Sequence, residues 1–447
     1  MNTDAIEALG RAPVENILNQ MGGWPVASAS WNGVDWTWQR SAALSRQFGY
    51  SVSYFFSFSV STDNKDSTKR IVRIDQASLG LSREYLIEGL EEPFISMDRE
   101  ERRDADKLYN LRTVAQLNTD YGYNDWLPYF NSLLPPESQL LIADEVIVGA
   151  LSFFEKLGDL LAATPDRVKA NYVMWRQAVS SVSYMPSAFK SRQEVFSRVT
   201  TGRATPDPRW LQCVDTTLSY YPHAFGALYA RKHFNEDAKK MALDMVNNIK
   251  NEFNEILKDI DWMDETTKEK AKEKADKMKE QIGFADELMD DAKIVEFYNE
   301  WPATVDEANY YASVFGLNIA SSLRTNKRLR QPIDKEEWTS QVTPAIVNAF
   351  YSSLENSIKF PAGILQGAFF SVDRPQYMNY GGIGFVIGHE ITHGFDDQGS
   401  QYDGAGNLDN WWEAETRTKY LERAQCIINQ YGNYTEPLTN LGLNGVN

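Results

Sequence analysis

The chain has 447 residues, of which 43% are hydrophobic and 13% aromatic, and this is enough to bury at least one large core. Its formal net charge of −17 and its pI near 4.8 argue against nucleic acid or an anionic membrane surface as a binding partner. It contains no run of about eighteen apolar residues and no signal-peptide pattern at the N-terminus, so we expect no membrane contact from this chain itself.

The first predicted element is a β-hairpin. Apolar side chains alternate with small ones over residues 50–61, and an apolar run at 70–74 follows across a polar turn. Alternation with a period of two residues places the apolar side chains on one face of a strand. The two runs therefore predict paired strands near residues 50–75.

Elsewhere the apolar residues recur with the period of an α-helix. One stripe comprises Ala242, Met245, Val246, Ile249, Phe253, Ile256, Leu257 and Ile260. A second stripe comprises Ala271, Ala275, Met278 and Ile282, within a segment rich in Lys and Glu. The charge run at 268–280 is interpreted as a solvated helix face with i,i+4 pairs. We therefore expect a mainly α-helical fold with a small β component.

A polar, basic stretch at 324–332, followed by the charged residues 334–337, predicts a passage between two lobes. We place a mainly helical lobe, which includes the hairpin, at 1–325 and a second lobe at 326–447. His223 and His233 are far in sequence from the other two histidines, and we interpret both as structural residues.

The strongest functional signal lies at residues 388–397, which read Gly-His-Glu-Ile-Thr-His-Gly-Phe-Asp-Asp. On a helix His389 and His393 project from one face, where two imidazoles can bind one zinc ion. Glu390 lies beside that position and can accept a proton from the water that attacks a peptide bond. Because the chain has only four His, the chance of this pattern is on the order of 10⁻³ per chain. The pattern therefore predicts a zinc cofactor and peptide hydrolysis.

Asp396 follows His393 by one helical turn. Its carboxylate can accept the ring N–H that His393 does not give to the metal. The alternative is a helix-terminal acid that faces solvent. We predict the first role, which makes Asp396 part of the catalytic site.

Several separate blocks, together with the His-Glu-x-x-His segment, resemble the neprilysin-type zinc metalloendopeptidases, a thermolysin-like family that includes the endothelin-converting enzymes. The resemblance covers essentially the whole chain, and its blocks lie at residues 23–26, 73–81, 262–264, 347–351, 360–366, 409–412, 425–426, 430–433 and 443–447. It implies a two-lobed fold in which a helical lobe covers the cleft of a thermolysin-like catalytic lobe. It also implies hydrolysis of internal bonds in peptides and small polypeptides, preferably on the N-terminal side of bulky apolar residues.

The resemblance assigns roles to individual residues, beginning with the two histidines as zinc ligands and the glutamate between them as general base. Asn348 matches the residue whose side-chain amide binds the substrate main chain. The carbonyl of Ala349 is the acceptor beside it, on an edge strand expected at 347–351. Four residues match the lining of the pocket for the residue after the scissile bond, and each alone also fits an ordinary core position. They are Ile364, Phe369, Phe385 and Val386.

Zinc needs a third protein ligand. The resemblance implies a Glu about sixty residues after the second His, and the sequence ends at Asn447, before that position. Glu413 lies at the spacing of about twenty residues that thermolysin-like relatives use, but it competes with Glu415 and we interpret it as a surface acid. The alternative function is therefore a catalytically incomplete fragment, or a non-catalytic homologue that binds peptides.

The chain has two cysteines, Cys213 and Cys426. The resemblance implies that each pairs with a cysteine outside this sequence, while the residues themselves leave a Cys213–Cys426 bridge or two free thiols open. Asn433 begins the only N-glycosylation sequon. The resemblance and the acidic charge predict an extracellular or cell-surface location. The protein is then either secreted or the ectodomain of a type II membrane protein, and we expect any export signal or anchor to lie outside this sequence.

Overall fold

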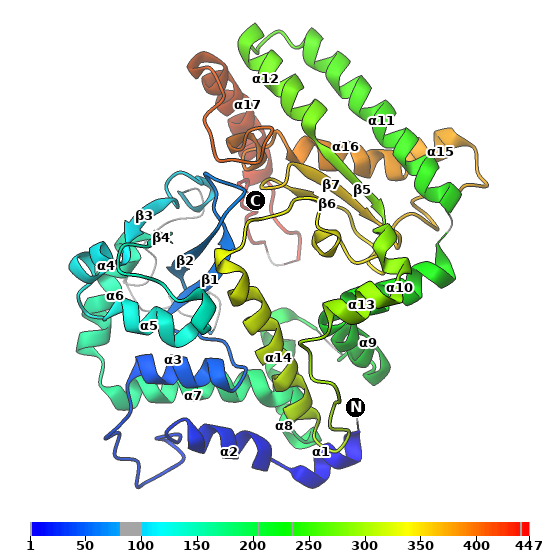
Figure 1. Ribbon diagram of the computed structural model, residues 1–447. Helices are drawn as coiled ribbons and strands as arrows, with labels where there is room; N and C mark the ends of the chain where they lie inside the picture. Colours follow the sequence, from blue (N-terminus) through cyan, green and yellow to red (C-terminus); the bar gives the residue numbers. More distant parts are fainter. Residues whose placement is uncertain (1, 81–100, 204, 235, 439, 447) are drawn as a thin grey trace.

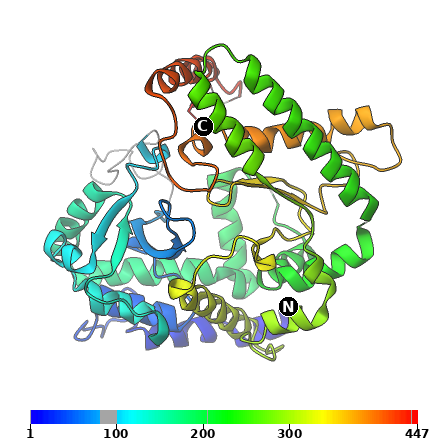
Figure 2. The same cartoon turned by 45° about the horizontal axis from the view of Figure 1, so that its top comes forward.

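A computed structural model describes residues 2–80, 101–203, 205–234, 236–438 and 440–446 (Figure 1). The fold is mainly helical, with 54% helix and 9% strand, which confirms the predicted fold class. The described residues form two β-sheets. Each sheet has its own set of helices, and the two sets make up an N-terminal and a C-terminal lobe (Figures 1 and 2).

The N-terminal lobe contains a four-stranded sheet in the order β1-β2-β4-β3. Its strands are β1 (Phe56–Thr62), β2 (Arg70–Gln76), β3 (Asn110–Thr113) and β4 (Glu145–Val148). β1 and β2 form the predicted hairpin, while β4 pairs parallel with β2 and antiparallel with β3. Phe56 and Phe58 of β1 are buried, which agrees with the alternation expected from the sequence.

Helices lie beside this sheet and below it (Figure 1). They are α1 (Thr3–Leu9), α2 (Ala12–Gln20), α3 (Trp38–Gln47), α4 (Val114–Asp120), α5 (Trp126–Leu133), α6 (Leu151–Ala163), α7 (Asp166–Ser181), α8 (Ser187–Thr201) and α14 (Tyr310–Lys327). Three further helices, α9 (Arg209–Tyr220), α10 (Pro222–His233) and α13 (Asp291–Phe297), lie below the sheet of the C-terminal lobe instead (Figure 1). The side chains of Thr113 and Gln116 form a capping box that begins α4. Among the described residues no helix is long and apolar enough to cross a lipid bilayer.

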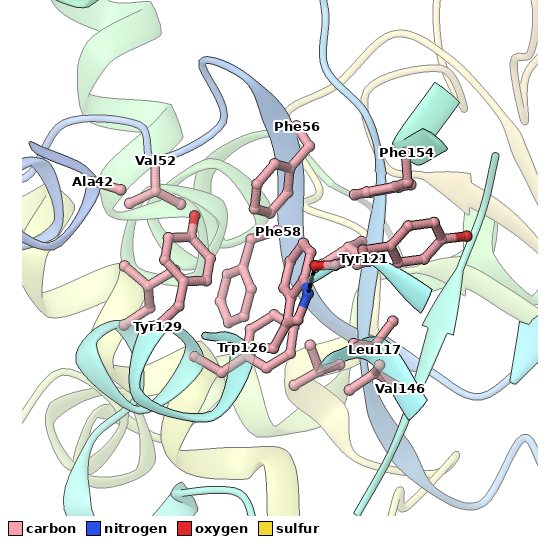
Figure 3. Packing of buried hydrophobic residues seen from close by; sticks show 14 of the residues in the cluster. Ala42, Val52, Phe56, Phe58, Leu117, Tyr121, Trp126, Tyr129, Val146 and Phe154 are labelled. Atoms are coloured by element: carbon pink, nitrogen blue, oxygen red, sulfur yellow. Dashed lines mark hydrogen bonds between the residues drawn. The ribbon is translucent and has the colours of Figure 1, made fainter. Parts of the chain in front are cut away.

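An aromatic cluster fills the space between this sheet and its helices (Figure 3). Trp126 is fully buried at the start of α5, and its indole N–H donates to the carbonyl of Tyr121 at 3.0 Å. Five of the described rings lie with their centroids 5.5–6.2 Å from that of the indole, and they belong to Phe56, Tyr123, Tyr129, Phe130 and Phe154. Tilted and edge-to-face contacts at such distances stabilise aromatic cores beyond simple burial.

His223 has the buried environment of a structural residue. Its ring packs against those of Phe297 and Trp338, at centroid distances of 4.5 and 5.0 Å. Burial lowers the pKa of His223 to about 4, so the imidazole is neutral near neutral pH.

The C-terminal lobe contains a three-stranded sheet in the order β5-β7-β6. Its strands are β5 (Lys279–Gly283), β6 (Phe350–Ser352) and β7 (Ser357–Pro361). β5 pairs parallel with β7 and β6 pairs antiparallel with it, so β6 is an edge strand. The helices of this lobe are α11 (Glu236–Asp259), α12 (Glu265–Lys277), α15 (Gln376–Gly381), α16 (Ile383–His393) and α17 (Ala414–Gly432). α16 packs against α11, beside the sheet (Figure 1).

One hydrophobic cluster joins α11, this sheet and α16. Its buried members include Ala242, Met245, Val246, Ile282, Ile358, Phe360, Ile383, Ile387 and Ile391. The division between lobes at 325/326 stays a prediction, but this cluster crosses it, because α11, α12 and β5 precede residue 325 and pack with the second lobe. The parallel pairing of β5 with β7 brings those earlier helices onto the sheet.

Two predictions of local structure were wrong at their boundaries. The first strand, expected from residue 50, begins only at Phe56. α12 ends at Lys277, and Ile282 lies in β5 rather than on the second helical stripe. The passage between lobes at 324–332 stays a prediction, and its first residues belong to α14, which ends at Lys327.

The turn of the β1–β2 hairpin reaches the C-terminal lobe. The carbonyl of Asn64 accepts from the backbone N–H of Leu408 at 2.6 Å. The hydroxyl of Ser67 donates to the side chain of Asn407 at 2.8 Å and to the carbonyl of Ala405 at 3.1 Å. These bonds join the hairpin to the segment that follows α16.

Replacement of Trp126 by Ala tests the aromatic cluster. We expect Trp126→Ala to lower the free energy of unfolding by about 3–5 kcal/mol, because the change leaves a large cavity among five rings. Trp210, which is 67% exposed on α9, supplies the matched control. Trp210→Ala should change the free energy of unfolding by less than about 0.5 kcal/mol. Urea unfolding measures both values, and equal losses in the two variants would contradict the assignment of this core.

Candidate active site

α16 divides into a buried face and a face that lines a groove. Ile383, Ile387 and Ile391 are buried in the cluster shared with α11 and the sheet. Phe385 and His389 line a groove of about 730 Å³ between α16 and α11. The spacing of four residues within each set follows from the helical period. The apolar face therefore fixes the helix and aims His389 at an open space.

The two histidines of α16 bring their ring nitrogens together. The Nε2 atoms of His389 and His393 lie 3.0 Å apart. Because imidazole nitrogens bind zinc at about 2.0–2.1 Å, two nitrogens at this separation fit as ligands of a single ion. The donor types and their spacing thus suit two positions of a zinc site.

Asp396 fixes the orientation of the second histidine. Its Oδ2 atom lies 2.7 Å from Nδ1 of His393, which leaves Nε2 of that ring for a metal. Its Oδ1 atom accepts the backbone N–H groups of Gln398 at 2.9 Å and Gly399 at 2.7 Å. The carboxylate is therefore held by the turn that follows α16 instead of facing solvent freely.

Glu390 is only 5% exposed, next to His389 in the sequence. Burial raises the pKa of its carboxyl, and the neighbouring His393 and His389 oppose that shift. A carboxylate with a raised pKa beside a metal position is suited to accept and return a proton.

The described residues contain no group of three His, Cys, Asp or Glu that could hold a metal ion. Glu413 is exposed just before α17, where its backbone N–H donates to the hydroxyl of Thr267 at 3.1 Å. It therefore does not join the histidine pair. Both cysteines are free, Cys213 partly buried and Cys426 exposed, so no bridge joins them.

Asn348 and Ala349 lie just before the edge strand. The strand expected at 347–351 begins only at Phe350, so the structure corrects its start by three residues. The side-chain oxygen of Asn348 accepts the backbone N–H of Ala349 at 2.9 Å. β6 also contacts α16, so the predicted substrate strand runs beside the helix that carries the histidines.

The four residues expected to line one pocket differ in their exposure, and their shared role stays a prediction. Ile364 is buried in the core beneath α16, and Val386 packs against the same core. Phe385 is 74% exposed in the groove beside His389, and Phe369 is 38% exposed. Phe385 alone shares a described groove with a histidine of the site.

Lys274 of α12 supports the site and was not predicted to do so. Its ammonium is buried and donates to the carbonyls of Gly399 and Tyr402, at 2.6 Å each. Burial lowers its pKa to about 7, against the opposing charges of Asp403 and Asp396. This residue corrects the interpretation of 268–280 as a uniformly solvated face. Its position among the apolar residues of the second stripe was a signal that could have revealed it.

The comparisons with known sequences give one consistent result. Sequence models described as peptidase family M13 match residues 1–94, 93–285 and 348–446. Neprilysin-2 of Drosophila melanogaster is 44% identical, over 100% of this chain and 64% of that protein. Endothelin-converting enzyme 1 of Bos taurus is 31% identical, over 97% of this chain and 62% of that protein. The chain thus spans less than two thirds of the length of these curated relatives.

Solved structures agree with the sequences. The zinc metalloprotease Zmp1 of Mycobacterium tuberculosis, in complex with an inhibitor, is 28% identical with a TM-score of 0.82, over 99% of this chain and 70% of that one. The same protein in an open state gives a TM-score of 0.69, over 100% of this chain and 72% of that one.

The lowered pKa of Lys274 predicts a dependence of stability on pH. In the folded protein this pKa is about 7, against 10.5 for an unperturbed lysine. Between these values the unfolded chain binds more protons, so the unfolding free energy rises with pH by up to about 1.4 kcal/mol per unit. Relative to Lys274→Met, we expect the wild type to gain roughly 2 kcal/mol between pH 7.5 and 9.5, measured by urea unfolding.

Lys270, exposed on the same helix, is the control for this measurement. Lys270→Met should retain the pH slope of the wild type. Parallel curves for the wild type and Lys274→Met would show that Lys274 keeps its ordinary pKa in the folded protein.

Proposed function

The chain belongs to peptidase family M13, and on this premise we propose that it serves the zinc-dependent hydrolysis of internal peptide bonds. Its substrates are peptides and small polypeptides, and it cleaves preferably on the N-terminal side of bulky apolar residues. The names of the relatives, which include neprilysins and endothelin-converting enzymes, support this class of reaction.

One observation carries the proposal. The Nε2 atoms of His389 and His393 converge at 3.0 Å beside the buried Glu390, while Asp396 holds the second ring from behind. These two histidines would hold zinc, together with a third ligand that is not among the described residues. When bound, zinc polarises the scissile carbonyl and raises the acidity of water.

Two residues of this chain, Glu390 and Asp396, have distinct roles in the proposed reaction. Glu390 accepts a proton at its carboxylate from the attacking water and then delivers it to the leaving amine. Burial, which raises the pKa of this carboxyl, makes it a better proton acceptor than a solvated glutamate. Asp396 keeps Nδ1 of His393 occupied, so that this ring presents its other nitrogen to the metal.

The edge strand supports the choice of a peptide as substrate. β6 has one side without a neighbour in its sheet, and an extended peptide can add to such an edge through its main chain. Asn348 and Ala349 lie just before this strand, where a side-chain amide and a carbonyl can bind the peptide backbone. Phe385, exposed in the groove next to His389, offers an apolar contact for a bulky substrate side chain.

We propose an extracellular or cell-surface location for the protein. A relative in Homo sapiens that is 32% identical is named membrane metallo-endopeptidase-like 1. The high negative charge is compatible with an exported ectodomain, and Asn433 is exposed at the end of α17, where a glycan could be attached. The cysteines Cys213 and Cys426 would then form disulfides with cysteines outside this sequence.

A second candidate function is peptide binding without turnover, or a catalytically incomplete fragment. It is favoured by one observation, the absence of a third His, Cys, Asp or Glu beside the histidine pair in the described part of the chain. Both functions use the same groove and edge strand, and they differ only in the metal site.

Zinc content and peptide cleavage, measured on the same sample, test the proposal. We expect one zinc per chain by elemental analysis and chelator-sensitive cleavage of a quenched apolar peptide. Glu390→Gln should keep the zinc and lose at least about 100-fold in cleavage rate, because the proton acceptor is lost while the ligands remain. His393→Ala should lose the zinc as well.

His233→Gln, at a histidine on α10 far from the groove in sequence, is the control and should retain both properties. A folded sample with little zinc and no cleavage would favour the second candidate. Full activity in Glu390→Gln would contradict the role of that residue.

A further inference from the structure

A turn of the N-terminal lobe contacts the segment that follows α16. The guanidinium of Arg103 donates to both carboxylate oxygens of Asp397, at 2.5 and 2.7 Å. Such a bidentate ion pair fixes the relative orientation of the two side chains as well as the distance between them. The two side chains are 34% and 42% exposed, and ion pairs this exposed contribute little stability. The pair is therefore better explained by the geometry that it imposes.

Amide side chains tighten the same contact. Gln398 and Gln401 both donate to the carbonyl of Arg103, at 2.6 and 2.7 Å. The side-chain oxygen of Gln401 accepts the backbone N–H of Ala105 at 2.7 Å. We call these residues, with Arg103 and Asp397, the lobe contact.

Arg102 anchors the turn in its own lobe. Its guanidinium donates to Asp75 at 3.1 and 3.3 Å, and Asp75 is nearly buried in strand β2. Gly149 lies so close that a Cβ there would come within 2.3 Å of the Asp75 carboxyl carbon. Asp75 is thus closely packed, and the position of Arg103 follows that of the N-terminal sheet.

One residue, Asp396, links the lobe contact to the histidine pair. Asp396 precedes Asp397, and its carboxylate binds the backbone N–H of Gln398 and the ring of His393 at the same time. A displacement of the segment at 397–401 therefore moves the carboxylate that orients His393.

We propose that Arg103 is a positioning residue for the metal site. It acts from the opposite lobe, through the segment at 397–401 and Asp396, on the ring of His393. This inference rests on the proposed function, because it takes the two histidines as metal ligands. Metal affinity then depends on contact between the lobes as well as on the ligands themselves.

Metal binding by the whole chain is the direct test. We expect Arg103→Ala to weaken Zn²⁺ and Co²⁺ binding by about threefold to tenfold in a competition with a chromogenic chelator, somewhat less than the loss of a residue that touches a ligand directly. Arg103→Lys should lie between Arg103→Ala and the wild type, because a lysine keeps the charge but cannot bind both oxygens in the same way. An affinity of Arg103→Ala equal to that of the wild type overturns the inference.

Arg112 supplies the matched control. It pairs with Asp120 at 3.1 Å within the N-terminal lobe, and the two side chains are 31% and 41% exposed. Arg112→Ala removes a similar ion pair without touching the segment at 397–401, so its metal affinity should equal that of the wild type. An equal loss in both variants would assign the effect to general destabilisation and overturn the inference. Asp397→Asn weakens the same ion pair from the other side and should reproduce the loss of metal affinity. This variant replaces Arg103→Ala in the test if Arg103→Ala does not fold.

A double-mutant cycle tests the route. If Arg103 acts through Asp396, then Arg103→Ala should cause no further loss of affinity in an Asp396→Asn background. Additive losses would overturn this route.

The histidine variants separate this inference from the proposed function. The double variant His389→Ala/His393→Ala should abolish binding at this site. Metal binding that survives it, or no binding in the wild type, overturns the proposed metal site and the inference with it. Histidine-dependent binding that is indifferent to Arg103 overturns the inference alone.

Discussion

The arrangement of the site depends on one carboxylate. Asp396 binds the ring of His393 and two backbone N–H groups at once, so the ring and the turn that follows α16 cannot be oriented independently. A charged acceptor shared by several donors holds its position more firmly than a single hydrogen bond does. Whatever holds the segment at 397–402 therefore also holds one of the two imidazoles.

That segment is held from both lobes. Lys274 binds two of its carbonyls from α12, through an ammonium buried without a carboxylate partner in salt-bridge range among the described residues. Burying a charge in this way is costly, and the benefit here is a fixed backbone. Arg103 binds it from the other lobe, where the neighbouring Arg102 anchors the turn to Asp75 of β2. The orientation of a histidine near the end of the chain thus depends on a sheet formed near its beginning.

Spacing along the chain predicted the elements that depend on near neighbours, namely the β1–β2 hairpin, α11 and the histidine pair. It failed at Ile282, because positions four residues apart share a face in both a helix and a strand. It could not find the partners of Lys274, which lie 125 and 128 residues away, or the contact of Arg103 with the far lobe. It also could not separate Ile364 in the core from Phe385 in the groove, because both positions select bulky apolar side chains.

The length of β6 has a consequence for self-association. An unpaired strand edge attracts any extended chain, and that includes the same edge on another copy of the protein. β6 is only three residues long, so a second copy would gain few main-chain hydrogen bonds from pairing with it. A peptide substrate of the kind proposed above would add side-chain contacts with α16, which packs against β6, to those few bonds. A short edge of this kind would therefore admit such a ligand while it offers little to aggregation.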